Sequence, residues 1–288
     1  MNYKGIILAG GKGSRLYPIT MGVSKQLLPI FDKPMIFYPL SVLMLAGIKD
    51  ILIITDEKDQ NAFKKTLGNG NAYGIELSYA IQKEPKGIAE AFIIAEKFID
   101  RKSVCLILGD NIFYGQNLAS NLKNAMKNPG ATVFTYQVSN PEDFGVLNLG
   151  KNKEILSIEE KPKNPSTNLA ITGLYFYDDK VIDYAKSIKP SSRGELEISS
   201  INNLYLKDKK LNIEQLGRGY AWLDTGTYNS LIEASQFIEI IQKRQGLKVA
   251  CLEEIAFNNG WVSSEKVLEQ ASIFNKTEYG EYLSNLVK

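Results

Sequence analysis

Short apolar runs alternate with helix-like segments through the first half of this 288-residue chain. The strand-like runs fall at 5–9, 51–54, 77–80 and 104–108, and the helix-like segments at 35–45, 60–67, 88–98 and 118–126. Such alternation is typical of a parallel sheet with helices on both faces. We therefore expect an α/β fold with a Rossmann-like, doubly wound, mostly parallel sheet. Ligands of such sheets bind beyond the carboxyl ends of the strands.

The rhythm changes after residue 130, where strand-like runs follow one another closely. They lie at 132–138, 146–149, 155–160 and 174–177. Close spacing without intervening helices predicts an added, more antiparallel layer. Helix-like stretches at 196–206 and 228–243 then frame a strand at 212–216 and a turn at 222–224, and a helical tail follows. We expect a core at 1–243 and a C-terminal helical segment at 244–288 that packs on the core or on a partner subunit.

Composition excludes several classes of protein. The 34 basic and 32 acidic residues give a net charge of +2 without charged runs, so we expect neither a nucleic acid polymer nor a membrane as partner. No stretch approaches the about 18 apolar residues of a membrane span, and residues 1–16 do not resemble a signal peptide. A cytoplasmic protein is the expectation.

The chain has no histidine and only two cysteines, Cys105 and Cys251. Histidine-based triads, histidine general bases and the usual zinc sites are therefore excluded. The remaining groups are carboxylates, lysine, arginine, backbone dipoles and a hard metal ion. These groups suit transfer at phosphorus, where positioning and charge stabilisation supply most of the rate.

The first strand-like run ends in a glycine-rich loop. Gly10, Gly11 and Gly13 are followed by Arg15 and Lys25. Glycines let backbone N–H groups approach a phosphate, and two cations can hold several phosphates. The loop matches neither the P-loop nor the dinucleotide fingerprint, and a turn without a ligand is the alternative at this point.

The longer pattern resembles the sugar-nucleotide pyrophosphorylases over nearly the whole chain. The matching motifs are LAGGKGSRLYPIT at 8–20, SKQLLP at 24–29, KPMI at 33–36, LGDNIFYG at 108–115, SIEEKP at 157–162, RGELE at 193–197 and WLDTGT at 222–227. The departures are Ser14, where the family often has threonine, and Leu252, where it often has proline. The likeness is greatest to the branch that joins dTTP and glucose 1-phosphate, and it implies Mg²⁺-assisted release of pyrophosphate. In that reading about 1–130 binds the nucleotide and about 131–227 binds the sugar.

The resemblance implies four catalytic residues. Asp110 and Asp224 would hold one Mg²⁺, as two carboxylates that leave positions for water and phosphate oxygens. Arg15 and Lys25 would stabilise the departing pyrophosphate. Taken alone, Asp110 could be a turn residue, Asp224 the N-cap of a helix that starts near Gly226, and both cations could be solvated surface charges.

The resemblance also implies the substrate contacts. Nucleotide binding is expected of Leu8, Gly10, Gly11, Gly13, Ser14, Arg15, Lys25, Gln26, Gln82, Pro85, Gly87 and Asp110. An amide such as Gln82 offers a donor and an acceptor to the edge of thymine or uracil, and Gly87 would let the base lie flat. Sugar-phosphate binding is expected of Gly145, Glu160, Lys161, Thr172, Tyr175, Arg193 and Asp224. Alternatively, Lys161 is an ordinary strand end, Tyr175 is core and Gln82 is a surface residue.

Members of this family are commonly homotetramers that a pathway end product inhibits through a second nucleotide site. The resemblance places that regulatory site at Tyr114, Gly115, Arg218, Lys248, Val249 and Cys251. Lys248 and Arg218 would contact phosphate there, although each could be a solvated charge.

Other functions fit parts of the pattern. Transfer of a uridylyl group to the same sugar, or of a thymidylyl group to an amino sugar phosphate, stays open. A binding protein that senses sugar nucleotides without turnover is another class, but it would not need both aspartates and Lys25. A glycosyltransferase would show an Asp-x-Asp motif, which Asp110-Asn111-Ile112 lacks.

Overall fold

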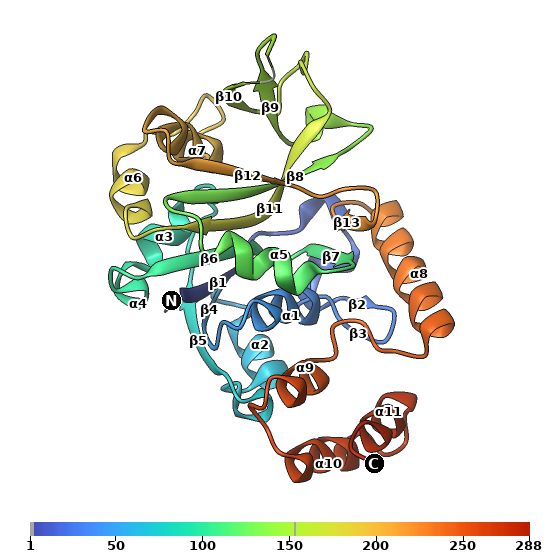
Figure 1. The fold of residues 1–288 in the computed structure, drawn as a ribbon. Coiled ribbons are helices and arrows are strands. Elements are labelled where there is room, and N and C mark those ends of the chain that lie inside the picture. Colours follow the sequence, from blue (N-terminus) through green and yellow to red (C-terminus); the bar gives the residue numbers. More distant parts are fainter. Residues whose placement is uncertain (1–2, 153) are drawn as a thin grey trace.

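A computed structural model describes residues 3–152 and 154–288, and in this part of the chain nine strands form one central sheet (Figure 1). Its parallel half consists of β1 (Tyr3–Ala9), β4 (Asp50–Thr55), β5 (Glu76–Ile81) and β6 (Ser103–Leu108). β1 lies between β6 and β4, and β5 is at the edge. The carboxyl ends of β1 and β6 therefore lie side by side, next to the glycine loop.

The antiparallel strands continue this same sheet. They are β8 (Ala131–Gln137), β9 (Gly145–Leu149), β10 (Ile155–Glu160) and β11 (Leu169–Tyr177), and β12 (Leu211–Gln215) runs parallel to β8. β11 pairs with β6 and so joins the two halves. The expected α/β fold, mostly parallel at its centre with added antiparallel strands, is confirmed; the antiparallel part extends the sheet edge to edge.

Helices cover both faces of the sheet. One face carries α1 (Phe37–Leu45), α2 (Gln60–Leu67) and α5 (Leu118–Ala125), and the other carries α3 (Glu90–Ile94), α4 (Glu96–Ile99), α6 (Val181–Ser187) and α7 (Ile198–Lys207). The apolar side chains of β1 alternate between the two faces. Ile7 packs into the core beneath α1, α2 and α5, and Ile6 packs into the core beneath α3, α4, α6 and α7. Side chains of a strand point to opposite faces in turn, so a short apolar run can bury both faces.

Three local expectations were wrong. The single helix expected at 88–98 is broken at Ala95 into α3 and α4. The turn expected at 222–224 is the end of β13 (Tyr220–Asp224), which pairs with β7 (Asn111–Gly115) in a separate ribbon. α6 lies where no element was predicted. The ribbon joins segments more than a hundred residues apart, and no local pattern reveals such a pairing.

The C-terminal part consists of α8 (Tyr228–Gln245), α9 (Leu252–Asn258), α10 (Ser264–Ile273) and α11 (Glu278–Leu286). Leu252 and Ala256 of α9 are fully buried in the core that α1 also contributes to. In Figure 1, α10 and α11 lie below the sheet, far from β9 and β10. The shorter elements are the hairpin of β2 (Pro29–Ile30) and β3 (Lys33–Pro34) and 3-10 turns at Ser14–Leu16, Ile19–Met21, Lys25–Leu27, Asn71–Tyr73 and Pro141–Asp143.

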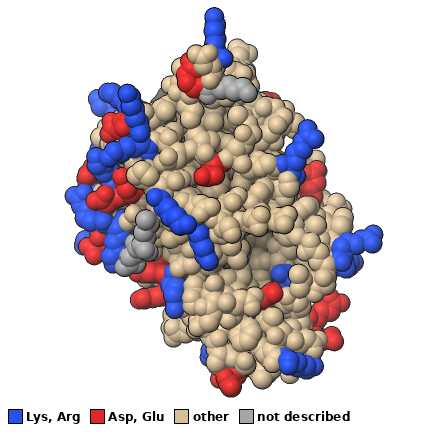
Figure 2. Space-filling model, viewed as in Figure 1, with Lys and Arg blue, Asp and Glu red and all other residues tan. Residues whose placement is uncertain are grey.

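Charged side chains of both signs gather along the edge near α4 and α6 on the face that Figure 2 shows. Lys186 pairs with Glu96 and Arg101 with Asp183 there. Basic side chains on this edge thus have acidic neighbours. Within the described residues, no helix combines the length and the apolar character that crossing a membrane requires.

Candidate active site

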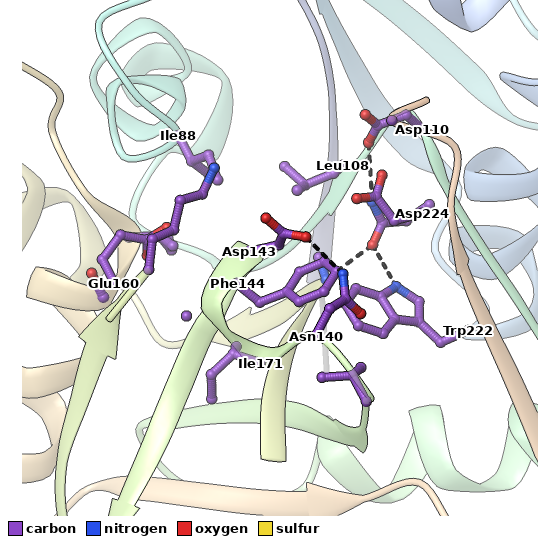
Figure 3. Close-up of a pocket in the computed structure, with 18 of the residues that line it drawn as sticks. Ile88, Leu108, Asp110, Asn140, Asp143, Phe144, Glu160, Ile171, Trp222 and Asp224 are labelled. Carbon is purple, nitrogen blue, oxygen red and sulfur yellow. Dashed lines mark hydrogen bonds between the residues drawn. The ribbon is translucent and has the colours of Figure 1, made fainter. Parts of the chain in front are cut away.

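A cavity of about 500 Å³ opens beyond the carboxyl ends of the central strands. Figure 3 shows Asp110 and Asp224 on one side of it, near Trp222, and Glu160 on the opposite side. Of the residues expected from the sequence, the cavity is lined by Arg15, Asp110, Gly145, Glu160, Lys161, Tyr175, Arg193 and Asp224. The structure therefore brings the expected metal ligands and most of the expected sugar-phosphate residues to one place.

The two aspartates are placed by neighbouring strands. Asp110 follows β6 through Gly109, and Asp224 ends β13, where it pairs in register with Asn111. The Thr225 hydroxyl donates to the Asp110 carbonyl at 3.0 Å and ties the two segments together. Asp224 is not a helix cap: Thr227 caps α8, in a capping box with Ser230.

Lys25 donates from Nζ to Asp110 Oδ2 at 2.6 Å. Its side chain is only 8% exposed, so Lys25 is not a solvated surface charge. Burial acts to raise the pKa of Asp110, but the Lys25 charge and hydrogen bonds from Lys25 and Asn111 outweigh burial and hold that pKa below its usual value. Asp110 is thus an anion held by a buried cation, which is its expected state as a metal ligand.

Asp224 is in the opposite electrostatic situation. Burial, and then the negative charge of Asp110, raise its pKa above the usual value despite Lys25, Arg15 and Lys161 nearby. A cation between the two carboxylates would remove this repulsion. Both carboxylates offer hard oxygen ligands, and within the described residues no group of three or more acidic or cysteine side chains is arranged to hold a metal ion. Two protein ligands would leave positions for phosphate and water. The pair therefore fits Mg²⁺.

The glycine loop follows β1 and turns tightly. Gly11 (φ +118°) and Gly13 (φ +57°) adopt backbone conformations that favour glycine, with open space around Gly11. The Thr20 hydroxyl donates to the Gly13 carbonyl at 2.7 Å. A Cβ on Gly10 would lie 2.7 Å from Gln82 Oε1, so this glycine allows the loop to contact Gln82.

Gln82 is 4% exposed and therefore not a surface residue. Its Nε2 donates to Glu90 Oε2 at 2.7 Å, which leaves one amide hydrogen and the Oε1 acceptor for a base. Glu90 orients this amide, and sequence reasoning missed it because its only signal is a place in the first turn of α3.

Gly87 has a structural reason of its own to be glycine. Its φ is +108°, and a Cβ would lie 2.4 Å from the carbonyl oxygen of Leu196. Leu8 is the penultimate residue of β1, Gln26 is buried beside Gly109, and Ser14 and Pro85 are exposed. None of these five residues lines the cavity of Figure 3.

At the sugar end, Arg193 lies among three carboxylates. Its guanidinium is 3.6 Å from Glu160, 3.3 Å from Glu195 and 3.5 Å from Glu197. Burial and the charge of Glu197 raise the pKa of Glu160 above its usual value, although Arg193 and Lys161 partly oppose this shift. Glu197 was not singled out from the sequence, although it belongs to the RGELE motif.

The other sugar-side residues differ in their placement. Lys161 has a φ of +44°, which is unusual for a non-glycine residue. Tyr175 is 3% exposed and still lines the cavity, so it serves the core and the cavity wall together. Thr172 is fully buried and is not among the residues that line the cavity.

The six residues expected at a regulatory site do not line one cavity. Tyr114 hydrogen-bonds Gln245, and the Tyr220 ring packs on Gly115. Lys248 donates to Asp32 at 2.9 Å and is 12% exposed, so it is not a solvated charge. Val249 donates from its backbone N–H to Gln242, and Arg218 is exposed. Cys251 is buried, and burial and the charge of Glu253 raise its pKa to about 12.

Comparison with known proteins decides the family. Residues 4–240 match the model of the nucleotidyl transferase family. The chain belongs to this family. The nucleotidyl transferase is 59% identical over 286 residues to glucose-1-phosphate thymidylyltransferase of Neisseria meningitidis serogroup A, covering 99% of each chain. It is 50% identical over 285 residues to the Mycobacterium tuberculosis enzyme of that name, again covering 99% of each.

Solved structures agree with this assignment. The nucleotidyl transferase resembles a structure described as a Bacillus anthracis glucose-1-phosphate thymidylyltransferase with bound sucrose, at TM-score 0.75 and 43% identity, covering 82% of this chain and 94% of that one. A UDP-glucose pyrophosphorylase with UDP-glucose aligns at TM-score 0.74 and 26% identity, covering 85% and 100%.

Proposed function

We propose that this nucleotidyl transferase makes dTDP-glucose and pyrophosphate from dTTP and glucose 1-phosphate, reversibly. The observation that carries the proposal is that Asp110 and Asp224 lie at the ends of neighbouring strands and both line the cavity. Lys25 and Arg15 lie beside them. The names of the relatives support thymidylyl transfer over uridylyl transfer.

The reaction needs little acid–base chemistry from the protein. A phosphate oxygen of glucose 1-phosphate attacks the α-phosphorus of dTTP in line, and the bond from that phosphorus to pyrophosphate breaks. The attacking group is already an anion at neutral pH, so no general base is required. Mg²⁺ held by Asp110 and Asp224 would neutralise phosphate charge. Arg15 and Lys25 stabilise the charge that develops on pyrophosphate.

The cavity would bind the sugar phosphate. Arg193 and Lys161 would contact its phosphate, and Glu160 would accept hydrogen bonds from ring hydroxyls. A Cβ on Gly145 would come within 3.3 Å of Glu160 Oε2, so a larger residue there would crowd this carboxylate. Gln82 would pair with the thymine edge.

We also propose a homotetramer with a second nucleotide-sugar site that includes Tyr114, Gly115, Arg218 and the 248–251 segment. The family resemblance is the support for both. Lys248 follows α8 and Tyr114 bonds to the end of that helix, so these two residues lie near one another.

Product analysis tests the proposed reaction. The protein is incubated with dTTP, glucose 1-phosphate and Mg²⁺, and products are identified by mass spectrometry. We expect dTDP-glucose and pyrophosphate in equal amounts, and none with Asp224→Asn as the matched control. Binding of both substrates without product would instead indicate a sensing protein.

A further inference from the structure

Asn111 is a buried polar residue of the site to which the sequence assigned no role. It follows Asp110 directly, begins β7 and is 3% exposed. Its side chain makes three hydrogen bonds to three different segments. A buried amide that is so fully bonded holds its partners in fixed positions.

The orientation of this amide follows from its donors. Asn111 Oδ1 accepts from Trp222 Nε1 at 2.7 Å and from the Gly173 backbone N–H at 3.1 Å. Two N–H groups require an oxygen at that end, so the NH₂ group must face Asp110. It donates to Asp110 Oδ1 at 3.0 Å.

β11 contacts the Asn111 amide closely at Gly173. A Cβ on Gly173 would lie 2.5 Å from Asn111 Oδ1, so only glycine allows the approach. The register of β11 against β8 shifts between Ile171 and Tyr175, the stretch that contains Gly173. Such a shift leaves backbone groups outside the ladder, and the Gly173 N–H uses its freedom to bond Asn111.

Trp222 connects Asn111 to the cavity wall. Its indole lines the cavity and packs on Phe144 with ring centroids 5.0 Å apart. The Asn111 amide therefore links Trp222 in the cavity wall to Oδ1 of Asp110, whose other oxygen, Oδ2, accepts from Lys25.

We propose that Asn111 is a positioning residue that fixes the Asp110 carboxylate for the metal, and that Trp222 and Gly173 fix Asn111 in turn. The inference rests on the proposed function in that Asp110 is taken as a metal ligand. Lys25 on Oδ2 and Asn111 on Oδ1 each occupy one lone pair, which leaves acceptor capacity on both oxygens for a cation. Groups that orient metal ligands typically change metal affinity when they are removed.

The test measures Mn²⁺ binding to the full-length protein by electron paramagnetic resonance, which requires no turnover. Asn111→Ala should weaken Mn²⁺ binding by about 10–100-fold. Trp222→Phe, which removes one donor to Asn111 and keeps the bond to Asp110, should cause a smaller loss. Asn111→Ser is the second variant if the alanine protein does not fold, because its hydroxyl is too short to reach Asp110.

The Mg²⁺ dependence of turnover separates positioning from a general structural role. In Asn111→Ala the half-saturating Mg²⁺ concentration should rise, with turnover recovering as Mg²⁺ is raised. A folded variant with wild-type Mn²⁺ affinity, or turnover that is low at all Mg²⁺ concentrations with unchanged half-saturation, would overturn the inference. Absence of Mn²⁺ binding by the wild type would overturn it too. A wild type that binds Mn²⁺ but does not transfer thymidylyl groups would contradict the proposed function alone.

Discussion

Asp110 and Asp224 differ in what their charges do to folding. The Asp110 pKa is lowered, so its ionised form stabilises the folded state; this contribution is present above the ordinary pKa of 3.8 and is lost as pH falls toward the lowered value. The Asp224 pKa is raised, so the folded state binds the proton more tightly than the unfolded state does. Its ionisation therefore lowers the free energy of unfolding as pH rises from 3.8 through the raised pKa.

The opposite pKa shifts of the two aspartates predict opposite changes in stability when each is replaced by asparagine. Asp110→Asn should destabilise the metal-free protein at pH 7 by about 1–3 kcal/mol, because Lys25 loses its buried partner. Asp224→Asn should stabilise it, because the cost of burying a charge and the repulsion from Asp110 both disappear. Urea unfolding in EDTA at pH 7 measures both, and the gain from Asp224→Asn should vanish below the ordinary pKa. A destabilised Asp224→Asn protein at pH 7 would show that the ionised Asp224 carboxylate does not destabilise the folded state.

Lys25 and Arg15 should matter most as pyrophosphate leaves. We expect Arg15→Ala and Lys25→Ala to lower kcat by about 100-fold or more, with a smaller change in the KM for dTTP. Lys12→Ala is the matched control, since Lys12 is an exposed cation of the same loop and should be dispensable. A rise in KM at constant kcat would assign the two cations to substrate binding only.

Residue roles could be predicted where a motif carries them. Lys25 and Asp110 belong to contiguous patterns, and the structure brings them within 2.6 Å. Glu90 and Asn111 could not be assigned, because their roles depend on partners elsewhere in the chain. Gln82 shows both the success and the limit of this approach. The sequence pattern predicts a role for its amide, but it does not reveal that the amide donates one hydrogen to Glu90.

At the scale of elements, the loop before α3 is joined to the segment before α7. Leu196 donates from its backbone to Lys86 at 2.7 Å and accepts from Ala89 at 3.2 Å. Gly87 lies between these contacts, against the Leu196 carbonyl. This junction connects the loop that carries Gln82 with the segment that carries Arg193.

Gly87→Ala should disrupt this junction. The added Cβ meets the Leu196 carbonyl at 2.4 Å, at a φ that alanine disfavours. We expect a loss of about 1–3 kcal/mol in unfolding free energy and a higher KM for both substrates. Gly47→Ala, with φ +86° and nothing within 4 Å, is the control for backbone strain alone. Equal effects of the two substitutions would show that contact with Leu196 is unimportant.

Strands that obey local patterns were predictable. The apolar runs at 5–9, 51–54 and 104–108 all became central strands, because burial on both faces needs only a continuous apolar stretch. The ribbon of β7 and β13 was not predictable, since it forms by pairing two strands that are more than a hundred residues apart in the sequence. Asp224, one of the two proposed metal ligands, lies on that ribbon.

At the scale of the whole molecule, the C-terminal segment connects the core to the proposed regulatory site. Lys248 bonds to Asp32, which also accepts from Lys33 and Gln242. An effector phosphate that attracts Lys248 would compete with this contact. Two states with unequal effector affinity are what inhibition through a distinct site requires.

We expect a dTDP-deoxysugar to inhibit the enzyme, and Arg218→Ala or Lys248→Ala to weaken inhibition while turnover stays largely intact. Steady-state kinetics at varied dTTP, with light scattering for the mass, provide the measurement. The mass should be four times that of one chain. Strictly competitive inhibition that neither substitution changes, together with a monomeric mass, would contradict the regulatory site and the tetramer.

The most direct test of the account is pyrophosphate release from each nucleoside triphosphate in the presence of glucose 1-phosphate and Mg²⁺. Uracil differs from thymine by one methyl group, and one methyl group discriminates by about 10–200-fold. We predict that dTTP has the highest kcat/KM, that UTP is used within that factor, and that ATP and GTP give no measurable release. A preference for a purine nucleotide, or no release with dTTP, would contradict the assignment of Gln82 and of the reaction.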